Sequence, residues 1–247
     1  LSPTEYVRVM LDARRKVGSA EVFREIVEQK FSLHSLSGTA ELHAASLETN
    51  EWLTTDAKGD VVVYERWGAI NPKHFVATFS LVQFARWSVY RYEARAVLLD
   101  LLSRRARRVV RFTQVIDVRG VGLGHRKLGS YAKEWIGGDG SYSVPPLRSV
   151  AHLVGAGPTA TSVVNFFLRR LASEHQRQTT VLLPGDPFAS SADFAARFSR
   201  AALPADVGGE LRTGAEEHCC LGIELPALSD GDALWARYES DQQHALL

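Results

Sequence analysis

The chain has 247 residues, of which 45% are hydrophobic and 23% are charged, and its net charge at pH 7 is +1. These proportions are typical of an ordinary folded protein and exclude a wholly disordered chain. The near-neutral charge excludes a protein that binds polyanions through its whole surface, so nucleic acid is not an expected partner. No apolar run reaches the roughly 18–20 residues that a membrane-spanning helix needs.

The two cysteines, Cys219 and Cys220, are neighbours in the sequence, and adjacent cysteines do not build a disulfide framework. A reducing compartment is therefore expected, with the protein in the cytoplasm or at a membrane surface. The chain begins with Leu1, so a mitochondrial location after removal of a transit peptide is the alternative. No second ligand pair stands at zinc-like spacing from His218, so no metal site is expected.

Residues 1–48 predict a helical segment. Val22, Phe23 and Ile26 recur at helical spacing behind Ser19, which can cap that helix. Residues 31–50 are polar and mixed. Residues 213–247 form a separate tail, in which 233–238 predict a short helix.

Strands alternate with helices between residues 49 and 212. β-branched runs predict strands at residues 61–67, 109–117, 150–154 and 179–183. Apolar residues at helical spacing predict helices at residues 75–105, 128–136, 159–173 and 191–201. This alternation predicts an α/β domain in which helices flank a mostly parallel sheet.

The turn from Gly155 to Ala160 fits the G-x-G-x-x-A pattern of dinucleotide-binding folds. Glycines there let a pyrophosphate approach a helix N-terminus, and Asp186 follows the next strand, where an acid can bind a ribose. However, too little chain follows the motif for a two-half dinucleotide fold.

A G-x-S-x-G nucleophile motif is absent and the eight histidines are scattered, so we do not expect an enzyme. A dinucleotide enzyme is the second alternative.

The densest charge run is formed by arginines that close the predicted helix 75–105. A solvated helix end that complements the helix dipole explains them. Contact with anionic head groups or with an acidic partner is the functional alternative. The candidates for that contact are Arg104, Arg105, Arg107 and Arg108.

Several short motifs follow one another in a fixed order along residues 50–211. Residues 55–64 are similar to D-x-x-G-R-P-V, residues 116–121 to D-L-x-G, residues 153–158 to I-I-N-A-P, and residues 203–209 to L-P-x-x-x-G-G. Glu93 stands where a glutamate is usual, and Pro145-Pro146 stand where Y-P-E is usual. In this order the motifs resemble the CRAL-TRIO family of lipid-binding proteins, which includes the tocopherol transfer protein and the yeast phosphatidylinositol transfer protein. Residues 7–26 resemble the small helical domain that precedes this fold.

The resemblance implies a divergent, non-enzymatic member that binds a lipid or another small hydrophobic molecule, with lipid transfer as an extension of that activity. It implies an apolar pocket beside a mobile helix after Pro158 and no cofactor other than a bound lipid. The candidates for the pocket and its gate are Phe84, Tyr92, Phe112, Val154, Val163, Phe166 and Phe167. Further expected partners are a membrane surface and the subunits of a larger complex.

Two departures from the family pattern concern the head group. Phosphoinositide-binding members carry a glutamate after Y-P and a lysine at the start of the next strand. This chain has Pro146 or Leu147 at the first place and Thr179 or Thr180 at the second. Inositol recognition is therefore disfavoured, and the alternative function is a degenerate scaffold that serves as an accessory subunit of a larger, mitochondrial complex.

Overall fold

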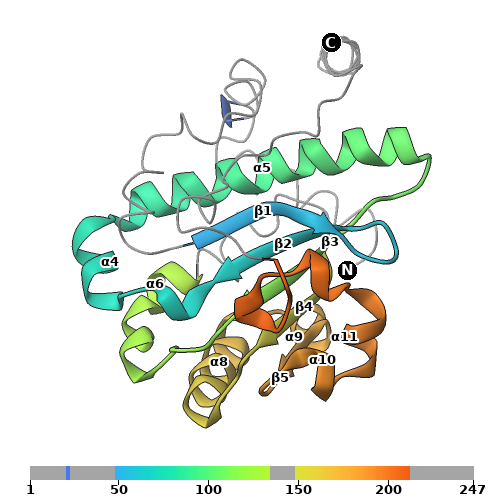
Figure 1. Ribbon diagram of the computed structural model, residues 1–247. Coiled ribbons are helices and arrows are strands. Elements are labelled where there is room, and N and C mark those ends of the chain that lie inside the picture. The colour runs from blue at the N-terminus through green and yellow to red at the C-terminus, as the bar shows by residue number, and fades with distance from the viewer. Residues whose placement is uncertain (1–20, 23–47, 134–147, 212–247) are drawn as a thin grey trace.

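A computed structural model describes residues 21–22, 48–133 and 148–211, and the structural statements below concern those residues. Their strands form one sheet in the order β1-β2-β3-β4-β5 (Figure 1). The strands are β1 (Glu48–Thr55), β2 (Val61–Arg66), β3 (Phe112–Asp117), β4 (Arg148–Val154) and β5 (Thr180–Leu183). β1 is antiparallel to β2, and the other neighbours are parallel. The expected α/β fold with a mostly parallel sheet is confirmed.

Helices connect these strands. They are α4 (Pro72–Thr78), α5 (Leu81–Ala106), α6 (Gly129–Ala132), α8 (Pro158–Leu171), α9 (Glu174–Gln178), α10 (Pro187–Ser190) and α11 (Ala192–Arg197). Short 3-10 turns are η2 (Trp67–Ala69), η3 (Leu123–Leu128), η5 (Arg200–Ala202) and η6 (Ala205–Val207). The single helix predicted at 75–105 is two helices, because the backbone is extended at Phe79 and Ser80, and Ser80 forms a capping box with Gln83 that starts α5.

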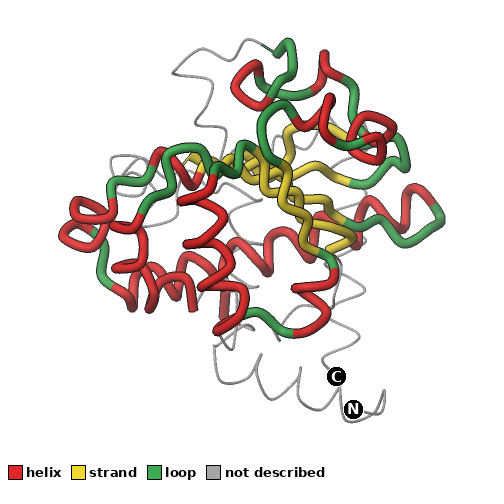
Figure 2. Tube along the Cα trace, turned by 90° about the horizontal axis from the view of Figure 1, so that it is seen from below, coloured by secondary structure: helices red, strands yellow, loops and turns green. Residues whose placement is uncertain are grey.

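Successive side chains of each strand point to opposite faces of the sheet. On β3, Gln114 and Ile116 face α5 and α8, whereas Thr113 and Val115 face the layer of α10, α11, η5 and η6. Figure 2 shows the strands as a central layer with helices on both sides. The described chain is therefore a three-layer α/β/α arrangement.

Each side of the sheet has its own core. Under α8, Ile116 and Leu153 pack against Val163 and Phe167. On the other side, a second cluster fills the space under α11 and η6. Its members are Val62, Tyr64, Val115, Val154, Leu183, Phe194, Phe198, Leu203 and Val207.

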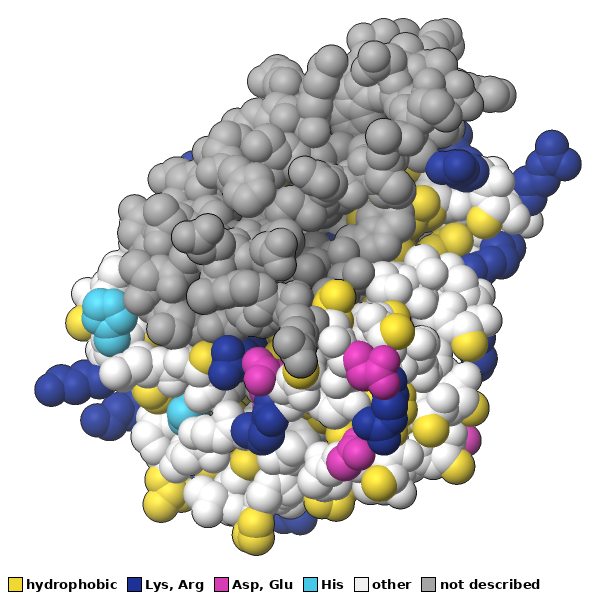
Figure 3. All heavy atoms as spheres, in the orientation of Figure 1, with side chains coloured by type: hydrophobic (Ala, Val, Ile, Leu, Met, Phe, Trp, Pro, Cys, Tyr) yellow, Lys and Arg dark blue, Asp and Glu magenta, His cyan; other side chains and the backbone are white. Residues whose placement is uncertain are grey.

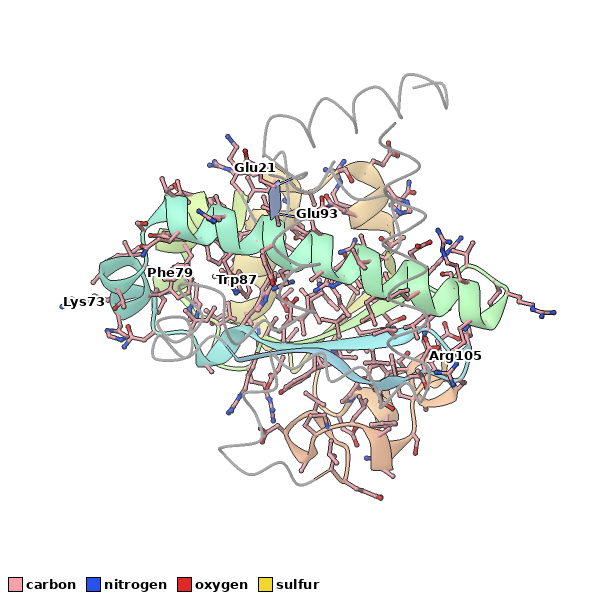
Figure 4. All side chains as sticks on the ribbon, turned by 90° about the horizontal axis from the view of Figure 1, so that it is seen from above. Glu21, Lys73, Phe79, Trp87, Glu93 and Arg105 are labelled. Atoms are coloured by element: carbon pink, nitrogen blue, oxygen red, sulfur yellow. The ribbon has the colours of Figure 1, made fainter. Side chains whose placement is uncertain are left out.

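Helix α5 is buried on more than its sheet side. Val22, in the described residues 21–22, packs in the same cluster as Trp87, Tyr90 and Ala94 of α5. Figure 4 shows Glu93 on α5 close to Glu21, and Glu93 is buried. This double coverage explains why the apolar positions of α5 do not form a single stripe.

Two glycines allow close approaches that a side chain would block. A Cβ at Gly68 would lie 1.4 Å from the carbonyl oxygen of Arg119, and a Cβ at Gly209 would lie 1.9 Å from that of Leu203. Gly209 ends the L-P-x-x-x-G-G motif, so this motif has a packing role here. Within the described ranges, no helix is long and apolar enough to cross a bilayer, and no three His, Cys, Asp or Glu side chains gather as metal ligands.

Candidate functional site

The sheet face under α5 carries polar side chains that we call the interior polar layer. It comprises Glu65 on β2, Gln114 on β3, Arg148 on β4, and Arg91 and Arg95 on α5. The two α5 arginines are one helical turn apart, so they leave the helix in the same direction. Strand alternation sends Glu65 and Gln114 toward them.

Glu65 is the acceptor at the centre of this layer. Its Oε1 accepts hydrogen bonds from Nη2 of Arg91 at 2.6 Å and from Nε2 of Gln114 at 3.2 Å. Its Oε2 accepts one from Nε1 of Trp67 at 2.8 Å. The Glu65 side chain is 0% exposed. A carboxylate removed from water is tolerated only when charge and donors compensate it, and these three donors do so.

Arg148 brings a further positive charge to the layer. Its Nη1 donates to Oε1 of Gln114 at 3.4 Å, and its Nη2 donates to Oγ1 of Thr179 at 3.0 Å and to the carbonyl oxygen of Gln176 at 3.1 Å. Burial lowers the pKa of Arg148, while the nearby Tyr92 and Glu65 act in the opposite direction. No carboxylate of the described residues forms an ion pair with it, and its hydrogen-bond partners among them are neutral oxygens.

Two of the predicted pocket residues border the interior polar layer. The Arg95 guanidinium lies 4.5 Å from the Phe112 ring centroid and 5.8 Å from that of Tyr92. Arg91 lies 5.7 Å from the Tyr92 ring. These aromatic faces stabilise the arginines by cation–π contact. Tyr92 and Phe112, which were predicted to line an apolar pocket, therefore contact guanidinium groups.

The predicted gate residues lie on α8, beside the interior polar layer and against the same face of the sheet. Val163 and Phe167 are buried on Ile116 and Leu153, and Phe166 is half-buried at the edge of that cluster. Turn-spaced apolar residues produce this packing, because positions 160, 163, 164 and 167 share one side of the helix. The sheet face is thus apolar under α8 and mixed under α5, where Val61 and Val63 pack against Leu99 beside the interior polar layer.

The remaining predicted pocket residues lie elsewhere. Phe84 packs against Phe75 and Tyr131, with ring centroids 5.7 and 5.4 Å apart. Val154 points to the opposite face of the sheet, toward Phe194. The seven residues are therefore divided among separate packing clusters. Val154 is separated because successive strand residues point to opposite faces, and Phe84 is separated because it lies in the first turn of α5, directly after the helical break at Ser80.

The arginine run at the end of α5 has partly structural contacts. Nε of Arg104 pairs with Oδ2 of Asp100 at 3.0 Å. Arg108 pairs with Asp60 at 3.1 Å and donates to the carbonyl oxygens of Lys58 and Gly59, which fixes the β1–β2 turn. Arg105 and Arg107 are exposed. Of the four candidates, which are all exposed, Arg108 thus holds the β1–β2 turn and Arg104 forms a local pair within α5.

The Gly155–Ala160 turn joins β4 to α8, as its pattern predicts. A Cβ at Gly155 would lie 2.2 Å from Cγ of Arg119, whose guanidinium pairs with Asp117 at 2.6 Å. An arginine side chain therefore fills the space beside the glycine. Dinucleotides bind where the strand order reverses, and the order β1-β2-β3-β4-β5 does not reverse at this turn. The geometry therefore does not favour a dinucleotide site here.

Sequence reasoning missed the interior polar layer. Arg91 and Arg95 stand at sheet-facing positions of α5, between the buried Trp87 and Leu98. Glu65 ends an apolar strand run and reads as a solvent-exposed residue. The sequence signal that could have predicted this layer is the presence of charged residues at helical positions that face the core. Pro145-Pro146, Leu147, His218, Cys219 and Cys220 lie outside the described residues.

The crystal structure of Sfh5, a yeast Sec14-like CRAL-TRIO protein, is similar to this structure, with a TM-score of 0.54 at 20% sequence identity. The similarity covers 74% of this chain and 61% of that chain, so this chain matches less than two thirds of the Sfh5 structure. No protein-family profile matches the sequence, and no curated protein matches it.

At this identity the similarity shows the fold alone. The fold is CRAL-TRIO-like, as the order of the sequence motifs predicted. Membership of the family, the ligand and the partners stay predictions.

Proposed function

We propose that this protein binds a lipid or another small hydrophobic molecule without transforming it chemically. The CRAL-TRIO-like fold supports a lipid-binding scaffold. The pocket that the resemblance implies lies between the sheet and the helix after Pro158, which is α8. The proposed ligand lies on the sheet face that α5 and α8 cover.

One observation carries the proposal: this interior face is amphipathic. Under α8 it presents Ile116 and Leu153. Under α5 the polar side chains of Glu65 and Arg148 lie on the same face as the apolar Val61 and Val63. A lipid has the same division into an apolar chain and a polar head. Each methylene that leaves water contributes about 0.8 kcal/mol, so an apolar chain supplies the binding energy and the polar end selects the ligand.

Arg148 is the proposed contact for the polar end of the ligand. Its guanidinium is half-buried, and its partners are an amide, a hydroxyl and a backbone carbonyl. Such a group gains from a ligand oxygen that carries negative charge. We therefore expect an acidic or strongly polar head group other than inositol phosphate.

The test is native mass spectrometry of the full chain after mild purification, with solvent extraction to identify any released molecule. We expect a bound lipid, and we expect Arg148→Met, which keeps the apolar stem, to carry fewer acidic lipids. The matched control is Lys73→Met at the exposed surface of α4 (Figure 4), which should keep the wild-type lipids. A bare chain mass, also after incubation with a total lipid extract, would disprove the proposal.

The second candidate is a scaffold that docks on a protein partner as an accessory subunit. An exposed apolar corner between α4 and α5 favours it: Val76, Leu81 and Val82 face solvent, and Val82 is 79% exposed. Figure 4 shows this end of the molecule, with Lys73 at its tip. The endogenous protein should migrate above the monomer in a native gel, and Val82→Asp should return it to the monomer position. Monomer migration of both proteins would exclude this candidate.

A further inference from the structure

A surface hollow lies between α8 and η3, on the side of α8 that faces away from the sheet. Its volume is about 390 Å³. The lining residues are Arg126, Ser162, Asn165, Phe166, Arg169 and Arg170. The α8 members share one side of the helix by their spacing, opposite the buried Val163 and Phe167. The hollow therefore lies outside the interior that the proposed function uses, and Phe166, at the edge of the cluster under α8, borders both.

The hollow has only positive charges in its lining. Arg126, Arg169 and Arg170 contribute three guanidinium groups, and no aspartate or glutamate lines it. None of the three forms an ion pair with a carboxylate in the described part of the chain. Seven other arginines in those residues do: Arg66, Arg91, Arg104, Arg108, Arg119, Arg197 and Arg200. Carboxylates neutralise most of the paired arginines of this fold, but none lines the hollow. The positive charge of its three guanidinium groups is therefore available to an external anion.

One aromatic ring organises two of these cations. The guanidinium carbon of Arg170 lies 4.5 Å from the Phe166 ring centroid, and that of Arg126 lies 5.1 Å from it. The ring thereby joins a residue of η3 to a residue of α8. Arginines held against a ring lose less conformational entropy when they bind, which strengthens binding. Ser162 and Asn165 add a hydroxyl and an amide, which are neutral hydrogen-bond donors.

We propose that this hollow binds a phosphate monoester group. Such a group carries about 1.5–2 negative charges at neutral pH and three terminal oxygens, which matches three guanidinium groups better than a single carboxylate does. The phosphate is either that of a soluble phosphate ester or that of a phosphomonoester lipid in a membrane. The site acts independently of the proposed interior ligand, so either can fail without the other.

The test uses the full chain and two probes that distinguish these sources. Glycerol 3-phosphate is titrated calorimetrically, and vesicles of phosphatidylcholine, with and without phosphatidic acid, are tested by flotation. The site variant is Arg169→Gln with Arg170→Gln. The control is Lys73→Gln with Arg111→Gln, which removes the same charge from exposed positions on α4 and directly before β3.

We expect the site variant to bind at least about tenfold more weakly, because a charge-assisted hydrogen bond corresponds to such a factor or more. The control should bind like the wild type. Phe166→Leu, which keeps apolar bulk but removes the ring, should also weaken binding. Loss of glycerol 3-phosphate binding in the site variant supports a soluble ester, and loss of flotation alone supports a lipid head group.

Two results would overturn the proposal. The first is that the wild type binds neither glycerol 3-phosphate nor vesicles that contain phosphatidic acid. The second is that the control variant loses as much binding as the site variant, since unspecific attraction would then explain the result. The unfolding midpoints of the two double variants should match the wild type, because their substituted side chains are exposed.

Discussion

Nη2 of Arg91 lies 2.6 Å from Oε1 of Glu65, and both side chains are almost fully buried between α5 and β2. The residues are 26 positions apart, so this pair fixes the long helix on the sheet. Figure 3 shows other acidic and basic side chains next to each other on the molecular surface, where water screens them. The buried pair is different, because either charge left alone would lie in a nearly dry interior.

We expect Glu65→Leu to lower the free energy of unfolding by about 3–5 kcal/mol, because it leaves the Arg91 charge and the Gln114 and Trp67 donors without their acceptor. Urea denaturation followed by circular dichroism measures the change. The control is Glu65→Leu combined with Arg91→Leu, which should be less destabilised than the sum of the single variants. Strict additivity of the two effects would contradict this account.

The strands of the parallel sheet could be predicted from sequence because they contain runs of β-branched residues, which favour strands. Val61–Val63 and Val115–Ile116 are β-branched runs that the structure places in β2 and β3. β1 was missed because its sequence, ETNEWLTT, is mostly polar. It is an edge strand paired on one side only, and its register shifts between Asn50 and Thr54, which removes a simple alternation.

The candidate site was less predictable than the fold. The partners of Glu65 come from β3, η2 and α5, and no local pattern reveals which distant residues meet. The buried residues of α8 were predictable because apolar residues at helical spacing after Pro158 must fall on one side of the helix. Val154 was misplaced for a related reason. A strand covered on both faces is apolar throughout, and its sequence does not tell the two faces apart.

Arg197 connects α11 to the β1–β2 turn. Its Nε pairs with Oδ2 of Asp56 at 2.6 Å, its Nη2 donates to Ser149 at 2.8 Å, and its carbonyl oxygen accepts from the backbone N–H of Ala57. We expect Arg197→Met to lower the free energy of unfolding by roughly 3 kcal/mol, since Asp56 is buried. Chemical denaturation measures this. Arg105→Met is the matched control and should change stability by less than about 0.5 kcal/mol; equal losses would contradict the assigned role.

Gly68 lies where η2 passes the turn after β3. Its Cβ position is 1.4 Å from the Arg119 carbonyl oxygen, and backbone cannot move aside as a flexible side chain can. We expect Gly68→Ala to lower the free energy of unfolding by more than about 3 kcal/mol, at the upper end of single-substitution effects. Gly124→Ala is the control, because its Cβ position has no atom within 4 Å. Thermal unfolding of the two variants compares them, and a stable Gly68→Ala protein would show that η2 packs differently.

His152 makes stability depend on pH. It lies on β4 under α11, with its ring centroid 5.1 Å from Phe194 and 5.5 Å from Phe198. Burial, and secondarily the positive charge of Arg197, lower the pKa of His152 from 6.5 to about 4, against the opposite effect of Asp193 and Asp56. Between these two values the unfolded chain binds the proton more readily than the folded chain does.

The contribution of His152 to stability is therefore complete above pH 6.5 and is lost as the pH falls toward about 4. The full loss amounts to roughly 3 kcal/mol, at 1.36 kcal/mol for each unit of pKa. We expect the free energy of unfolding of the wild type to decline over this interval more steeply than that of His152→Leu, as measured by urea denaturation at several pH values. Carboxylates contribute to the pH dependence of both proteins, so the difference between the two curves isolates the histidine. Parallel curves would mean that the ring is protonated in the folded state as easily as in the unfolded chain, and that the aromatic cluster under α11 admits water.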